Sequence, residues 1–167
     1  MIGGLVRGAL AGAAATVAMS IIMVVSERIG LMGRHPPERI VERGMAVADE
    51  PPNPDTVDAM AGAAHLAFGT VGGAAFGLLM NSRASVTGQR LAIPWALIIW
   101  LVSYFGWIPA LRILPPPTED RPGRAWTLLF AHLVYGVTLG ALWRWISSAS
   151  ATRVAGVLPT SWSSRGP

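Results

Sequence analysis

Four long runs of apolar residues alternate with short polar segments along the chain. None of the four runs, 8–26, 59–81, 91–111 and 125–143, contains Asp, Glu, Lys or Arg. A helix needs ~20 mainly apolar residues to cross a hydrocarbon core of roughly 30 Å. Backbone polar groups must be paired inside a bilayer, and no ten-residue alternation typical of barrel strands appears, so the runs are predicted to be helices. We expect an all-α membrane protein whose four transmembrane helices cover about residues 4–26, 59–81, 91–111 and 125–146.

A second helical pattern lies between the first two spans. Pro36 and Pro37 suit a helix start, and apolar residues then recur at helical spacing opposite charged ones. The pattern predicts a short amphipathic helix over about residues 37–48 that lies on the membrane surface. The alternative is a helix that merely covers the end of the bundle. Residues 1–148 are expected to form one transmembrane domain, and 149–167 a poorly ordered tail.

The composition is typical of a membrane protein. Only 13% of the residues are charged, against roughly 25% in soluble domains. The thirteen basic residues are all arginines, and they are spread over loops and helix ends. Nucleic-acid binding is therefore not expected, because it needs clustered basic residues on one element. Cysteine is absent, which excludes disulfides and thiolate metal sites.

Orientation follows from the charges at the span ends. With four spans both termini lie on the same side, and that side carries six arginines and no acid, whereas the other carries seven arginines and all nine acids. The two sides carry nearly equal numbers of arginines, so the positive-inside rule barely distinguishes them. The net charge favours cytoplasmic termini. Basicity supplied by arginine alone, with abundant alanine and glycine, suggests a bacterial genome, so we expect the bacterial inner membrane.

Small residues recur every fourth position in three of the four spans. Such stripes let helix backbones approach closely in lipid, where hydrophobicity cannot drive association. The third span is expected to lack a stripe, to pack as a wall of bulky aromatic residues and to bend at Pro109. A stripe on the first span is also a candidate surface for a homodimer. The predicted packing glycines are Gly4, Gly8, Gly12, Gly69, Gly73, Gly77, Gly136 and Gly140.

The chain repeats one motif. "AHLAFGTVGGA" at residues 64–74 returns as "AHLVYGVTLGA" at residues 131–141, with histidine, aromatic and glycines in the same places. Both spans run in the same direction through the membrane, and a proline pair follows spans one and three at similar distance. These matches predict two helical hairpins related by a pseudo-two-fold axis along the membrane normal, the parallel kind of repeat.

The repeated histidines, His65 and His132, are the candidate chemistry. An intramembrane histidine faces the bundle interior or a wet cavity and has a partner. Three alternatives remain open: hydrogen bonds across helices that hold the bundle together; a polar cavity for protons or small solutes; or one b-type haem held between the two imidazoles. The predicted cavity residues are His65, His132, Glu27, Asp58, Ser103 and Tyr135.

No pattern of a known reaction appears. The sequence holds no Ser/His/Asp ordering, no H-E-x-x-H and no phosphate-binding glycine loop with lysine. We therefore predict no catalytic residue. Two histidines are too few for a tetrahedral zinc site, and the third, His35, lies in a loop, so no metal site is predicted either.

Four short stretches, "GALAGAAATVAMS", "RHPPERIVERG", "GWIPALRILPPP" and "AHLVYG", are similar to segments of the YagU-like group of small bacterial inner-membrane proteins of unknown function. The tryptophan-glutamate pair of that group is represented here only by Ser26 and Glu27. The resemblance implies a four-helix integral membrane protein with a tie to envelope or acid stress, and it carries over no catalytic residue. The function expected from the sequence is structural, or the handling of small solutes or protons.

Overall fold

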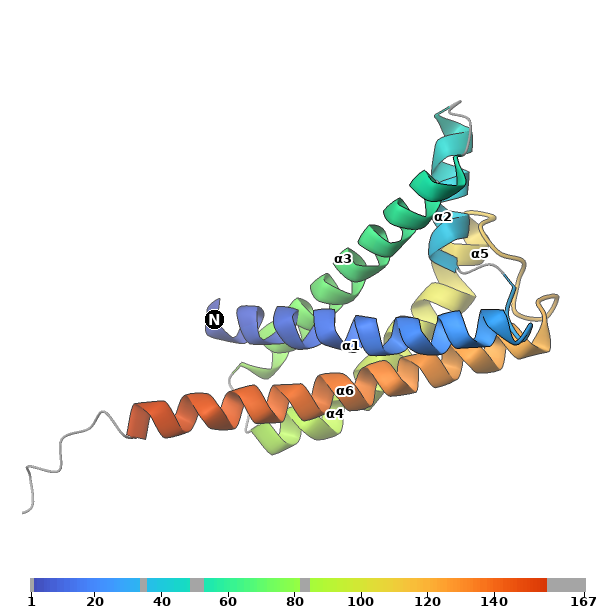
Figure 1. Cartoon of the computed structure of the whole chain (residues 1–167). Coiled ribbons are helices and arrows are strands. Elements are labelled where there is room, and N and C mark those ends of the chain that lie inside the picture. Colours follow the sequence, from blue (N-terminus) through green and yellow to red (C-terminus); the bar gives the residue numbers. More distant parts are fainter. Residues whose placement is uncertain (1, 34–35, 49–52, 82–84, 156–167) are drawn as a thin grey trace, which may run out of the picture.

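The computed structural model describes residues 2–33, 36–48, 53–81 and 85–155. Every regular element in these residues is a helix (Figure 1). The elements are α1 (Ile2–Arg28), α2 (Pro36–Val47), α3 (Pro54–Met80), α4 (Ser85–Leu101), the π-helix η1 (Val102–Trp107), α5 (Ile108–Ala110) and α6 (Pro122–Ala155).

Four segments are long and apolar enough to cross a membrane: Ile2–Arg28, Pro54–Met80, Val86–Ala110 and Pro122–Ala149. The prediction of four membrane-compatible helices is confirmed. Helix α6 continues to Ala155, into the segment 149–167 that was expected to form the tail, and the poor order expected of that tail stays a prediction. No proline or glycine stands between Gly140 and Gly156 to end the helix. Residues 156–167 lie outside the described residues.

The first helical pair is built on glycine. Gly4, Gly8 and Gly12 of α1 face glycines of α3, and a Cβ added to Gly12 would lie 2.5 Å from the Gly69 oxygen and 2.8 Å from the Gly73 Cα. The two antiparallel backbones are therefore in direct contact, as small residues permit in lipid. Because α3 already occupies this stripe, it is not available to a second copy of the chain, and the reason for expecting a homodimer through it is lost.

The second pair, α4 with α6, also packs through small residues. A Cβ on Gly136 would lie 3.0 Å from the Ala96 Cβ, and one on Gly140 would lie 3.1 Å from the Ala92 Cβ. The expectation that the third span lacks a small-residue stripe is wrong, since Gly88, Ala92 and Ala96 fall at four-residue steps and face α6. Alanine does not stand out in a hydrophobic run because it counts as an ordinary apolar residue, although its side chain is only a Cβ.

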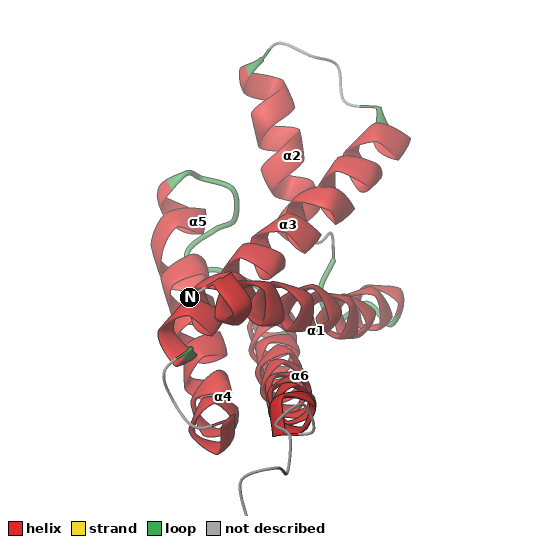
Figure 2. Ribbon diagram, turned by 90° about the vertical axis from the view of Figure 1, so that its left-hand side faces the viewer, coloured by secondary structure: helices red, strands yellow, loops and turns green. Residues whose placement is uncertain are grey.

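Helix α1 joins the two pairs, because it packs against α3 on one side and α6 on the other. Away from the glycine contact, the N-terminal half of α3 diverges from α1 (Figures 1 and 2). α1 ends where Gly30, at φ +77°, lets the Leu31 amide donate to the Ser26 carbonyl at 2.9 Å. This is the Schellman ending that favours glycine, and it turns the chain back toward α6.

Helix α2 appears where the amphipathic pattern predicted a helix. Its Val41 and Met45 pack on Val57 and Ala61 at the start of α3. Figure 2 shows α2 standing beside the diverging half of α3. The apolar side of α2 thus covers part of α3, which is the alternative that the sequence left open. A position of α2 on the membrane surface stays a prediction.

Helix α4 continues directly into the π-helix η1, where the Ile108 amide donates to the Ser103 carbonyl. Pro109 follows at once. Its ring has no N–H to donate and clashes with the carbonyl four residues back, so the helix gains one residue in its turn ahead of the proline. The bend expected at Pro109 takes this form, and the wider turn places Ser103 and Tyr104 in the interior.

Candidate functional site

A cavity of about 210 Å³ lies where α1, α3, η1 and α6 separate. We call it the central cavity. Both histidines of the repeated motif line it. So do aromatic rings from α3, α4 and η1, and the first turn of α2. Its lining residues are Thr16, Met19, Met23, Pro36, Pro37, Ile40, Ala64, His65, Phe68, Gly69, Ile99, Trp100, Ser103, Tyr104, Trp107, Ile108, Leu128, His132 and Tyr135.

The structure brings together most of the residues predicted for a cavity. His65, His132, Ser103 and Tyr135 lie on the wall of the central cavity, whereas Glu27 and Asp58 do not. Both acids belong to the outer turns of their helices. The described part of the wall therefore carries no acid, and its polar groups are hydroxyls, imidazoles and indoles. His35 lies outside the described residues.

His132 is held by its own helix. Its Nδ1 lies 2.8 Å from the Leu128 carbonyl oxygen, one turn earlier in α6. A carbonyl accepts only, so Nδ1 carries the proton, and Nε2 is left with a lone pair. This differs from the expectation that the imidazole bonds across helices. His132 thus presents a fixed ring to the central cavity.

Two aromatic residues donate hydrogen bonds across helices. The Tyr135 hydroxyl donates to the Gly69 carbonyl at 2.8 Å, and the Trp95 Nε1–H donates to the Gly72 carbonyl at 3.1 Å. Tyr135 and Gly69 each belong to a copy of the repeated motif. The two copies are therefore in direct contact, and the contact fixes one end of the central cavity.

The π-helix supplies the opposite wall. The Trp107 Nε1–H donates to the Ser103 hydroxyl at 3.2 Å, and Trp100 stacks on Tyr104 with ring centroids 6.0 Å apart. Ring packing fixes these side chains, so the wall is preformed. π-Helical turns are frequent at functional sites, and here the turn brings the Ser103 hydroxyl and two aromatic rings, those of Tyr104 and Trp107, to one cavity.

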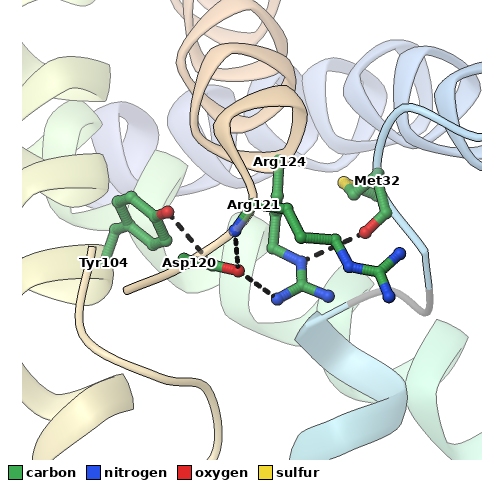
Figure 3. Close-up of polar contacts among 5 residues, drawn as sticks. All are labelled: Met32, Tyr104, Asp120, Arg121 and Arg124. Carbon is green, nitrogen blue, oxygen red and sulfur yellow. Dashed lines mark hydrogen bonds and ion pairs between the residues drawn. The ribbon is translucent and has the colours of Figure 1, made fainter. Parts of the chain in front are cut away.

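A chain of polar contacts leads from this wall to the start of α6 (Figure 3). The Tyr104 hydroxyl donates to Oδ2 of Asp120 at 3.0 Å, and Oδ1 of Asp120 accepts from Nη1 of Arg124 at 2.5 Å. Nε of Arg124 donates to the Met32 carbonyl at 3.2 Å. The side chains of Asp120 and Arg124 are 1% and 8% exposed, so this is a buried ion pair, and its carboxylate accepts from the Tyr104 hydroxyl, the Arg121 amide and Arg124.

Arg124 is the residue that sequence reasoning missed. It was counted only as one of seven arginines on the acidic side. The signal was present, because Asp120 and Arg124 are four residues apart at the start of a span, the spacing of an ion pair on one helix face. What the sequence did not show is that Met32, 92 residues earlier, closes over the pair.

The central cavity is small for a porphyrin. Ligand pockets usually measure roughly 300–1,000 Å³, against about 210 Å³ here. A haem between His65 and His132 would require α3 and α6 to move apart, which the Tyr135–Gly69 bond and the α1–α3 backbone contact oppose. In its present shape the cavity suits a smaller, mostly apolar guest.

One family model covers nearly all of the chain, residues 2–154, and its description is a family of unknown function, DUF6789. The chain belongs to DUF6789. The matched residues of this DUF6789 chain include every helix that lines the central cavity except the last residue of α6. No curated protein and no solved structure matches the DUF6789 chain. The resemblance to the YagU-like group stays a prediction, because nothing in this match links the two.

Proposed function

We propose that this chain is a multi-pass membrane protein that binds a small, mostly apolar molecule in the central cavity. The observation that carries the proposal is the cavity itself, about 210 Å³ with walls from α1, α2, α3, α4, η1, α5 and α6. Protein interiors are close-packed, and voids larger than a water molecule are few. The cavity is partly open, because Ala64 and Phe68 of its wall are exposed, and its wall atoms gain contacts when a molecule occupies it.

The lining supports selective binding over mere loose packing. Ligand sites are mostly apolar and aromatic, with a few placed polar groups. The central cavity has this composition, with Trp100 and Tyr104 stacked on one wall and the imidazole of His132 held by the Leu128 carbonyl on the other. The proton-relay alternative is weaker, because no acid lines the described wall.

The test uses a small neutral probe, the methyl ester of octanoic acid with a diazirine on its chain, photolysed with the protein in phosphatidylcholine nanodiscs. Labelled peptides are mapped by mass spectrometry. We expect labels on residues of the cavity wall such as Trp100 and the buried Tyr104. Ala64→Phe should remove them, because Ala64 lies on the wall and the added ring fills the space.

Ala63→Phe is the matched control. Ala63 is the neighbour of Ala64 on α3, is exposed, and does not line the cavity, so it adds the same ring to the same helix. Labels confined to lipid-facing residues, or equal loss in the two variants, would refute binding in the central cavity.

We also propose that the protein lies in the bacterial inner membrane with cytoplasmic termini. The support is that the side of the membrane with both termini carries no acidic residue. The chain has no cysteine, so a single cysteine can be introduced at an exposed position without removing others. Ala149 and Thr118 are both exposed and lie at opposite ends of the membrane-compatible segment Pro122–Ala149, since Ala149 is its last residue and Thr118 precedes its first. Ala149→Cys should resist a membrane-impermeant maleimide applied from the periplasm, whereas Thr118→Cys should react. The reverse pattern would show the opposite orientation.

Finally, we propose that the two hairpins are copies. Equivalent positions support this: Gly12 packs against Gly69 in the first pair as Ala96 packs against Gly136 in the second, and the two histidines line one cavity. In an experimental structure, superposing α1 and α3 on α4 and α6 should bring each of these residues onto its counterpart. A different register would contradict duplication.

A further inference from the structure

A second hollow opens on the outside of the bundle, where the N-terminal half of α3 diverges from α1 (Figures 1 and 2). Its volume is about 490 Å³, and its wall is one face of α1, from Thr16 to Arg28, together with Gly62 and Leu66 of α3. We call it the lateral groove. Thr16 alone is common to the walls of the lateral groove and the central cavity as far as the described residues show, so the two are separate spaces.

The wall of the lateral groove is mostly apolar and faces away from the protein. Val17 and Ile21 are 56% and 58% exposed, and Leu66 across from them is 42% exposed. On the α3 side, a Cβ added to Gly62 would have nothing within 4 Å, so the groove is open there. In a bilayer, exposed apolar side chains at a span are covered by hydrocarbon, and this hollow offers it contact on two sides.

The shape of this wall suits a lipid chain better than another helix. Helices associate in lipid through small residues that let their backbones approach closely. The glycine stripe of α1 is already in contact with α3, and the α1 face at the lateral groove carries the branched side chains of Val17, Ile21 and Val24. A flexible acyl chain can follow such side chains without close backbone contact.

One end of the lateral groove is charged, because Arg28 lines it. Arg28 is the last residue of the membrane-compatible segment Ile2–Arg28, and it follows directly on the charge-free run 8–26 and Glu27. At 1.5 Å per residue, a helical run of that length spans roughly the 30 Å of the hydrocarbon core. Arg28 therefore lies at the boundary between hydrocarbon and headgroups when this run fills the core.

The guanidinium of Arg28 is available to a ligand. Arg28 is exposed, and no carboxylate of the described residues forms an ion pair with it. Its neighbour Glu27 does not line the lateral groove. Guanidinium groups bind phosphate through paired, charge-assisted hydrogen bonds. The same groove thus carries an apolar wall within the span and a cation at the span end, in the order in which a phospholipid presents its acyl chain and its phosphate.

We infer that the lateral groove binds an anionic phospholipid of the surrounding bilayer, with one acyl chain along Val17, Ile21 and Val24 and the phosphate on Arg28. A net negative headgroup is preferred, because the choline of a zwitterionic lipid brings a second positive charge close to Arg28. The inference concerns a second site and does not depend on the guest of the central cavity.

The test compares phosphatidylglycerol and phosphatidylcholine that carry the same diazirine-bearing acyl chain, each at the same mole fraction in phosphatidylcholine nanodiscs. After photolysis, labelled residues are mapped by mass spectrometry. One arginine near a membrane surface favours an anionic lipid by about fivefold. We expect phosphatidylglycerol to label Ile21 and Leu66 about five times as strongly as phosphatidylcholine does. Val71 and Val137, exposed apolar residues outside the groove, should be labelled equally by the two lipids.

Arg28→Gln should remove the preference for phosphatidylglycerol at Ile21 and Leu66. Because Arg28 is exposed and has no ion-pair partner in the described residues, this variant should unfold in SDS at the same point as the natural protein. Arg144→Gln is the control, since it removes the same charge from an exposed residue near the other end of the bundle, where the guanidinium bonds Gln89. It should keep the preference.

A second pair of variants tests the apolar part. Gly62→Phe places a ring in the open space of the lateral groove and should remove the labels of both lipids from Ile21. Ala63→Phe adds the same ring at the next residue of α3, which is exposed and does not line the groove, and should leave these labels in place.

Equal labelling of the groove by the two lipids, a preference that persists in Arg28→Gln, or equal effects of Gly62→Phe and Ala63→Phe would each overturn the inference. A second copy of the chain is the competing occupant. The natural chain has no cysteine, so oxidation of Ile21→Cys reports on such a contact. Disulfide-linked dimers together with absent lipid labels would assign the lateral groove to a second copy and refute lipid binding there.

Discussion

Replacing Gly12 by alanine tests the physical basis of the fold most directly. The new Cβ would lie 2.5 Å from the Gly69 oxygen and 2.8 Å from the Gly73 Cα, whereas ordinary contacts begin near 3.4 Å. Both neighbours are backbone atoms, so no side chain can turn away. The two helices must move apart by about 1 Å, and a gap of that size forfeits a quarter to a half of each contact.

The expected cost follows from overpacking, about 1–3 kcal/mol. Alanine also favours a helix over glycine by up to about 1 kcal/mol, and this gain partly hides the cost. Gly62→Ala separates the two effects, because Gly62 lies within α3 and has nothing within 4 Å of its added Cβ. The difference in free energy of unfolding between the variants should be about 1–3 kcal/mol.

The assay is unfolding by SDS from mild detergent micelles, followed by the fluorescence of the seven tryptophans. Gly12→Ala should unfold at a lower SDS fraction than the natural protein, and Gly62→Ala at the same or a higher one. If the two variants unfold together, the close contact of α1 with α3 does not stabilise the bundle, and the account of helix packing given above is refuted.

Two further substitutions test the polar contacts. Tyr135→Phe removes the bond to the Gly69 carbonyl and should lower the free energy of unfolding by about 0.5–1.5 kcal/mol in the same SDS assay; no change would mean that the bond contributes nothing. Asp120→Asn leaves Arg124 buried without its charged partner and should cost about 3–5 kcal/mol, while the neighbouring exposed Glu119→Gln should be neutral. A small loss in Asp120→Asn would show that water reaches Arg124.

Much of the site was within reach of sequence reasoning, because its residues belong to a repeated motif. His65 and His132 occupy the same position of the repeated motif, and the spans that carry them, the second and the fourth, cross the membrane in the same direction. The two histidines are therefore expected at the same depth. Ser103 and Tyr135 were found as polar groups inside charge-free runs. Glu27 and Asp58 were predicted to line the cavity and do not. Both lie near a span end in the sequence, but that position does not decide whether a side chain faces the cavity.

Other features depended on contacts that no local pattern reveals. The alanine stripe of α4 became visible only when Gly136 and Gly140 were seen against it. The proline at position 109 indicated a bend, but its form as a π-turn that turns Ser103 and Tyr104 inward was not predicted. The ion pair of Asp120 and Arg124 is covered because the loop after α1 returns to the start of α6 and brings the Met32 carbonyl to Arg124.

The sequence by itself determined that the chain forms four membrane-compatible helices, because a charge-free run of some twenty residues has no other way to pair its backbone in lipid. Only the tertiary structure decided which faces meet and where they separate. The physical reason is that lipid surrounds apolar side chains as readily as protein does, so hydrophobicity cannot choose partners. That choice was made by backbone contact at glycines and by bonds such as Tyr135 to Gly69, 66 residues apart.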